Sequence, residues 1–221
     1  MNSNNSSMNR RNFLAKTSLA SVGLLGLNCF VQATEPISAN KEESLFVIGP
    51  LEGYSPQIGT LVSMLNYNRY TIINSVKALS LEQIDYLHDQ KANSIAALVM
   101  HLGAVEKYYQ VNSFEGRQEF SEKDQKFWGS AMDLGDEGRK NIKGKHIKYY
   151  LDLLEEVRKK TLEEFKKKDD QWLLAIDPEW SKETPLNTYW KWFHVCEHES
   201  NHRGQISWLK SRLPGAKGSN D

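Results

Sequence analysis

The stretch from Trp190 to Trp208, WKWFHVCEHESNHRGQISW, decides how the rest of the chain is interpreted. It contains three histidines, His194, His198 and His202, at intervals of four residues. Four residues turn an α-helix by about 400°, so His198 and His202 lie one turn apart on the same face. Two imidazoles at this spacing can bind one metal ion, but a metal centre needs at least one further ligand from elsewhere in the chain.

The N-terminus has the features of an export signal rather than of a folded element. Arg10 and Arg11 precede an apolar run from Leu19 to Val31, and small residues that a signal peptidase accepts follow around Ala33. We therefore expect residues 1–33 to be a cleaved signal peptide. The mature protein would be periplasmic or otherwise extracytoplasmic, and would meet the membrane only during export.

The paired arginines, with a phenylalanine and a leucine just after them, resemble a twin-arginine signal. Three alternatives remain: an ordinary secretory signal, an uncleaved anchor, and a lipoprotein modified at Cys29. The apolar run is shorter than the roughly 20 residues of a spanning helix, which argues against the anchor. The residues Gly26-Leu27-Asn28 lack the small side chains expected before a lipidated cysteine.

Composition limits the class of protein. The full chain has 28 basic and 28 acidic residues, and no basic stripe with interleaved aromatic residues, so nothing predicts a nucleic-acid partner. Of two cysteines, only Cys196 would remain after signal cleavage, which excludes an internal disulfide. Cys196 is expected to pack as a small hydrophobic residue.

Apolar residues at three- and four-residue steps predict four main helices, and therefore an all-α, antiparallel four-helix bundle. The first is expected to begin at Ser55-Pro56, the second at Asn93-Ser94, the third to span Lys145–Lys168, and the last to run from Thr184-Pro185 to Leu213. No convincing strand pattern is present.

The predicted division of the mature chain is a linker over residues 34–52, the bundle over residues 53–213 and a tail over residues 214–221. Helical periodicity breaks over residues 112–144, which contain several glycines. This segment is long for a connection in a bundle, so part of it is expected to be a short helix, a flap over a pocket or a decorated surface loop.

The sequence from His198 to His202 also satisfies the zincin pattern His-Glu-x-x-His, in which the glutamate is the general base. The residues after His202 contain no histidine, glutamate or cysteine, and their only acid is Asp221. A zincin-type metalloprotease is therefore disfavoured. Glu199 remains a candidate base at best, because it points about 100° away from His198 and can simply face solvent.

The third ligand must then come from upstream, and His101 is the natural candidate. It lies within the apolar stripe of the second helix, three residues after Leu98 and four before Val105, so it faces the core. The alternative is a hydrogen-bonded core histidine. His194 is about 12 Å along the helix axis from His202, too far for both to bind one ion. His194 and Gln205 are instead expected to support the site by orienting a ligand or lining the pocket.

The run His-x-x-x-His-Arg-Gly-Gln, from His198 to Gln205, follows an aromatic-rich turn and is paired with a mid-chain histidine, His101, on an earlier helix. Over residues 53–213 the chain resembles the DinB-like superfamily, in particular a branch of unknown function. The resemblance implies an up-down-down-up four-helix bundle, commonly dimeric, with a divalent ion such as zinc or nickel near one end. It also implies that His101, His198 and His202 are the metal ligands.

Characterised relatives include metal-dependent thiol transferases and a thiol-dependent isomerase. The expected function is therefore a metal-dependent transferase or hydrolase that uses an activated thiol or water. The export signal is a departure from simple members of the superfamily, so their cytoplasmic thiols transfer poorly to this chain. Two alternatives remain: a non-catalytic bundle that holds a metal or a small ligand, and a purely structural cluster of core histidines.

Overall fold

The computed structural model describes residues 43–180 and 183–216. The predicted signal peptide, the first part of the predicted linker and the last five residues of the predicted tail lie outside this range. Within it, no helix is both long and apolar enough to cross a membrane.

The described residues are helical, as predicted. The main helices are α2 (Pro56–Val76), α4 (Ile95–Glu115), α7 (Ile147–Phe165) and α9 (Thr188–Lys210). The short elements are η1 (Glu43–Phe46), α3 (Leu81–Asp85), α5 (Glu122–Asp133), α6 (Gly135–Asn141) and α8 (Asp170–Leu174). Across the described part of the chain, β structure is confined to one isolated bridge between Ile176 and Asn187.

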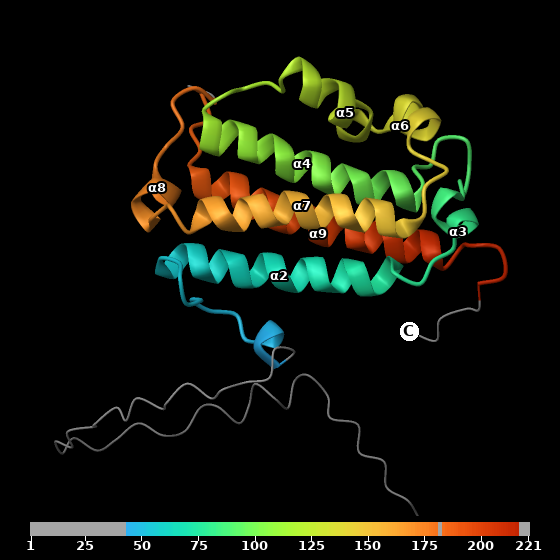
Figure 1. Ribbon diagram of the computed structural model, residues 1–221, viewed down its shortest axis with the longest axis horizontal. Helices are drawn as coiled ribbons and strands as arrows, with labels where there is room; N and C mark the ends of the chain where they lie inside the picture. Colours follow the sequence, from blue (N-terminus) through green and yellow to red (C-terminus); the bar gives the residue numbers. More distant parts are fainter. Residues whose placement is uncertain (1–42, 181–182, 217–221) are drawn as a thin grey trace, which may run out of the picture. The chain divides into compact units, whose positions relative to one another are not determined.

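The four main helices form a bundle with up-down-down-up order (Figure 1). Helices α2 and α9 run in one direction, and α4 and α7 run in the other. The register agrees, since Asn68 of α2 bonds to Cys196 and Ser75, further along α2, bonds to Lys210. Helix α4 packs against α7 and α9, and α2 completes the bundle against the same two helices.

Most predicted helix starts are confirmed. Ser94 caps α4 by accepting a hydrogen bond from the Ala97 amide, and Ser80 and Gln83 form the expected capping box of α3. The predicted start of the last helix was wrong. Asn187 caps α9, because its bridge to Ile176 keeps the chain extended beyond Thr184-Pro185.

Helix α2 begins at Ser55-Pro56 as predicted, but its cap comes from a distant residue. The Ser55 side chain does not cap its own helix. The Asp170 carboxylate of α8 instead accepts hydrogen bonds from the Ser55 hydroxyl at 2.6 Å and from the Gln57 amide at 3.1 Å. This contact ties α8 to the start of α2.

The segment 112–144 contains two helices, α5 and α6, rather than an extended loop. Helix α5 packs against α4 and buries Trp128. Gly103 of α4 makes the close approach possible, since a Cβ atom there would lie 3.2 Å from the Trp128 ring. Helix α5 therefore forms a wall beside α4.

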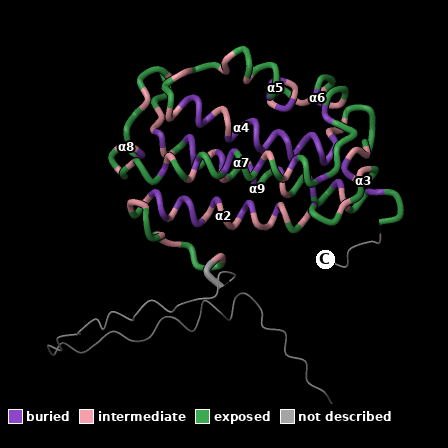
Figure 2. Tube along the Cα trace, viewed as in Figure 1, coloured by how far each residue is buried: buried purple, intermediate pink, exposed green. Residues whose placement is uncertain are grey.

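Buried residues occur along the main helices (Figure 2), and the apolar ones form two clusters. Between these clusters lies a group that we term the charge tetrad, to which each main helix contributes one member. Its members are Arg69, Glu106, Arg158 and Glu199.

The tetrad pairs every charge with two opposite charges. Arg69 contacts Glu106 at 2.7 Å and Glu199 at 2.5 Å, and Arg158 contacts the same two carboxylates at 2.7 and 2.8 Å. Burial alone would raise the pKa of Glu106, but Arg158 and Arg69 lower it to about 2. The tetrad is therefore a neutral ion network in the middle of the core.

Candidate metal centre

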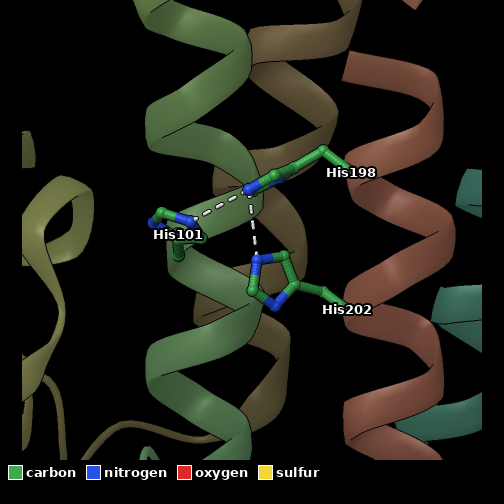
Figure 3. Close-up of side chains that lie close together, drawn as sticks. All are labelled: His101, His198 and His202. Atoms are coloured by element: carbon green, nitrogen blue, oxygen red, sulfur yellow. Dashed lines mark hydrogen bonds between the residues drawn. The ribbon is translucent and has the colours of Figure 1, made fainter. Parts of the chain in front are cut away.

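The structure brings together the three histidines predicted from sequence, which we term the histidine triad. His101 extends from α4, and His198 and His202 extend from α9, one turn apart (Figure 3). The Nε2 atom of His198 lies 3.3 Å from Nε2 of His101 and 3.2 Å from Nε2 of His202. The ligand atoms of the three rings all lie within 4.8 Å of one another.

The opposite ring nitrogens are held by hydrogen-bond acceptors. Nδ1 of His101 lies 2.7 Å from the carbonyl oxygen of Ala131, near the end of α5. Nδ1 of His202 lies 3.1 Å from Oε1 of Gln205. An oxygen acceptor requires a proton on Nδ1, so the Nε2 atoms of both rings present lone pairs to the centre of the triad.

The triad is neutral at physiological pH. Burial lowers the pKa of His101 to about 4. Burial, followed by the nearby His202, lowers the pKa of His198 to about 3, and burial also lowers the pKa of His202. Loss of solvent disfavours the protonated form of an imidazole, which leaves each ring in the form that binds metals.

These residues fit a divalent metal ion. Nε2 of His198 lies 3.2–3.3 Å from the Nε2 atoms of both other rings, and when its proton is on Nδ1 all three Nε2 lone pairs are available to one shared cation. Three neutral imidazoles suit zinc-type ions and leave a coordination position for a substrate or water. His198 is partly buried, whereas His101 and His202 are buried.

The two predicted supporting residues lie next to the triad without joining its three-nitrogen centre. Gln205 bonds to His202. The ring of His194 lies 5.4 Å from that of His198, and its Nδ1 is 2.9 Å from a Glu197 carboxylate oxygen. Cys196 is half-buried, and burial raises the pKa of its thiol to about 11, so it remains a protonated packing residue as expected.

The expectation that Glu199 can simply face solvent was wrong. This residue is 1% exposed, and its Oε1 atom accepts hydrogen bonds from Arg69 and Arg158 in the charge tetrad. Its position on α9, about 100° from His198, directs it toward the two buried arginines. The tetrad was missed from sequence. Its signal was a charged residue on the apolar face of each helix, such as Arg69 between Leu65 and Ile72.

The up-down-down-up bundle, with histidines converging from its second and last main helices, defines the DinB-like class, and the resemblance seen in the sequence is confirmed. The chain belongs to the mycothiol-S-transferase family, whose model matches residues 60–215. A search among curated proteins gives no match. The family and the triad together indicate a divalent metal and a metal-dependent thiol S-transferase-like function.

Proposed function

We propose that the protein is an exported S-transferase that depends on a zinc or nickel ion held by His101, His198 and His202. The observation that carries this proposal is the convergence of the three Nε2 atoms, two of them on rings whose Nδ1 atoms are already held by oxygen acceptors.

A bound divalent ion would lower the pKa of a thiol or water at its open position and so supply a nucleophile at neutral pH. The chain's own residues prepare for this. The Ala131 carbonyl and Gln205 fix two of the rings, and burial keeps all three unprotonated. His198 is the least buried of the three rings, which is consistent with access of a thiol to this side of the site.

A non-catalytic bundle that holds a metal or a small ligand is the second candidate. It is favoured by the position of Glu199 in the charge tetrad, because the residue that would act as a base in a zincin is buried and bound through Oε1 to two arginines. Thiol transfer does not require that base, since metal coordination by itself promotes loss of the thiol proton.

Export and dimer formation are also part of the proposal. The signal-like residues 1–33 would deliver the folded protein, with its metal, across the membrane by the twin-arginine route. Its thiol substrate would then be one present outside the cytoplasm. Mass spectrometry of the protein from a cell-envelope fraction would detect cleavage near Ala33, and sedimentation analysis would detect a homodimer. An uncleaved cytoplasmic chain would contradict export.

The first test is the metal content of the full chain, compared with a His198→Ala, His202→Ala double variant. We expect about one divalent ion per wild-type chain and almost none in the double variant, because one imidazole cannot retain the ion. Inductively coupled plasma mass spectrometry measures both. Absence of metal in the wild type after zinc and nickel have been supplied would contradict the proposal.

The second test is turnover of a small thiol with a small electrophile. The metal-loaded wild type should conjugate N-acetylcysteine with iodoacetamide faster than the double variant does. Equal rates in the two proteins, with metal bound only to the wild type, would favour the non-catalytic bundle.

A further inference from the structure

A groove of about 860 Å³ lies between α5 and α7, apart from the metal centre. Both helices pack against α4 (Figure 1), which contributes Lys107 and Gln110 to the lining. The described residues that line the groove include no member of the histidine triad or of the charge tetrad. Pockets for small molecules usually have volumes of roughly 300–1,000 Å³, so the groove is large enough to hold one.

The floor of the groove is mostly apolar. Trp128 and Val157 line it and are 6% and 7% exposed, and Leu153 is half-buried in the same lining. Phe127 also lines the groove but is 44% exposed. An apolar group of a ligand would cover Phe127 and Leu153 and remove their surface from water, which is favourable.

Gln110 is the one polar residue of the described lining that carries no charge, and it is 4% exposed. Its amide nitrogen donates hydrogen bonds to the Val157 carbonyl at 2.6 Å and to the Thr161 hydroxyl at 2.9 Å. Both amide hydrogens are therefore used, and the side chain can offer a ligand only its carbonyl oxygen, which is an acceptor. An acceptor does not attract a negative charge, so an anionic group of a ligand would lie at the rim rather than on the floor.

The rim carries more positive than negative charge, because five lysines and three acidic residues line the groove. Two of the lysines have acidic neighbours. The ammonium group of Lys107 lies 3.9 Å from the Asp124 carboxylate, and that of Lys160 lies 2.6 Å from the Glu164 carboxylate. On α7, Lys159 lies between Glu156 and Glu163 at three- and four-residue spacing, at which opposite charges offset one another.

The lysines that remain are Lys123 and Lys126 of α5. Both are exposed, and neither forms an ion pair with another residue in the described part of the chain. Lys123 and Phe127 are four residues apart, so they lie on one side of α5 about 6 Å apart along its axis. A negative charge held by these lysines would therefore lie one helical turn from the apolar surface of Phe127.

We infer that the groove binds an amphipathic carboxylate, a molecule with one carboxylate on an alkyl chain. The carboxylate lies at Lys123 and Lys126, and the chain lies over Phe127 and Leu153. The acidic side chains of the same lining would repel a doubly charged phosphate more strongly, which favours a single negative charge. This site goes beyond the proposed S-transferase function and does not rest on it.

The test compares three small molecules that separate the two parts of the ligand. Decanoate has the carboxylate and the chain, acetate has the carboxylate alone, and decyltrimethylammonium has the chain with the opposite charge. Isothermal titration calorimetry measures their binding to the full chain below the micelle concentration. Decanoate should bind, and the other two should bind much more weakly. Equal affinities for decanoate and decyltrimethylammonium would overturn the inference, and so would a failure of decanoate to bind.

Two variants test the placement of the ligand. Lys123→Gln, Lys126→Gln should weaken decanoate binding about three- to tenfold, because it removes both positive charges at the carboxylate. Phe127→Ala should weaken decanoate binding by a similar factor, because it removes apolar contact surface. All three side chains are exposed, so the variants should keep the fold.

Matched controls change the same kinds of residue outside the groove. Lys140→Gln, Lys143→Gln removes two exposed lysines at the same spacing, and Phe193→Ala removes an exposed phenylalanine of α9. Neither control should alter decanoate affinity. The inference is overturned if a control weakens binding as much as its groove variant, or if the groove variants bind like the wild type.

Further arms of the experiment identify other occupants. The His198→Ala, His202→Ala double variant should bind decanoate as the wild type does, and loss of binding in it would place the carboxylate at the metal centre instead. Sedimentation analysis of Phe127→Ala should show the same oligomeric state as the wild type. Dissociation of a dimer by this change would make the groove an interface between two copies and overturn the inference.

Discussion

Gln205 determines which nitrogen of His202 is available to a metal. Its side-chain oxygen lies 3.1 Å from Nδ1 of His202, and the residue itself is exposed on α9. Gln205→Ala should weaken metal binding about 10- to 100-fold, because the ring loses the contact that fixes its tautomer and orientation. Competition with a chromophoric chelator measures this affinity.

The Gln205→Ala variant should lose metal affinity but almost no folding stability. Since the side chain is exposed, unfolding free energy should change by less than about 0.5 kcal/mol. Asn201→Ala, an exposed change on the same helix, is the control and should leave metal affinity unaltered. Equal affinities of the Gln205→Ala variant and the wild type would show that Gln205 does not orient the ligand.

The lowered histidine pKa values predict how the metal-free protein responds to acid. Unfolded histidines titrate near 6.5, whereas folded His101 and His198 titrate near 4 and 3. Below about pH 6.5 the unfolded state therefore binds more protons than the folded state, and stability falls as the pH is lowered toward about 4. Urea denaturation between pH 7 and pH 4 measures the change.

The control for this pH dependence is a His101→Gln, His198→Gln variant. It lacks the two titrating groups, so its stability should vary less over the same interval. A wild-type protein with constant stability from pH 6.5 to pH 4 would contradict the lowered pKa values.

At the scale of the element, α2 depends on a cap supplied by α8. The Asp170 carboxylate accepts hydrogen bonds from the Gln57 and Ile58 amides at the first turn of α2. Asp170→Ala should cost about 1–2 kcal/mol of unfolding free energy, the usual effect of removing a cap. Chemical denaturation would measure this loss.

Asp152→Ala is a suitable comparison, because Asp152 forms an exposed ion pair with Lys148 on the surface of α7. Its removal should cost less than about 1 kcal/mol. Similar costs for the two variants would mean that Asp170 contributes no more than a surface charge.

Helix starts show which part of each element is predictable. Ser80 and Ser94 cap the helices that immediately follow them, so their signals are local and readable from sequence. The start of α9 depends on a bridge from Asn187 to Ile176, and the cap of α2 depends on Asp170. Neither contact follows from the residues next to the helix, which is why the start of α9 was misplaced.

At the scale of the molecule, the charge tetrad connects all four main helices. Glu199→Ala would leave Arg69 and Arg158 with a single buried carboxylate between them. Removing one partner of a buried ion pair costs about 3–5 kcal/mol, since the remaining charge has lost its compensation. We expect a loss of this size in chemical denaturation.

Glu197→Ala provides the control, because Glu197 lies on the same helix but is exposed. Its effect on unfolding free energy should be within about 0.5 kcal/mol. A Glu199→Ala variant as stable as the control would show that the tetrad adds little to the fold.

Contacts between separate helices also decide how much of the site could be predicted from the sequence. The spacing of His198 and His202 gave two members of the triad, and the core-facing position of His101 gave the third. The tetrad could not be found in this way. It joins residues from four separate helices, and one sequence shows which residues face inward but not which partner each will meet.

The placement of the triad also sets an order of events during synthesis. His101 and His198 are separated by 97 positions, and two of the three ligands lie on the last helix. A growing chain therefore has only one ligand until α9 has left the ribosome and docked beside α4. All three ligands come together only after α9 has docked in the bundle. Metal held by the complete triad would therefore indicate that the bundle has formed.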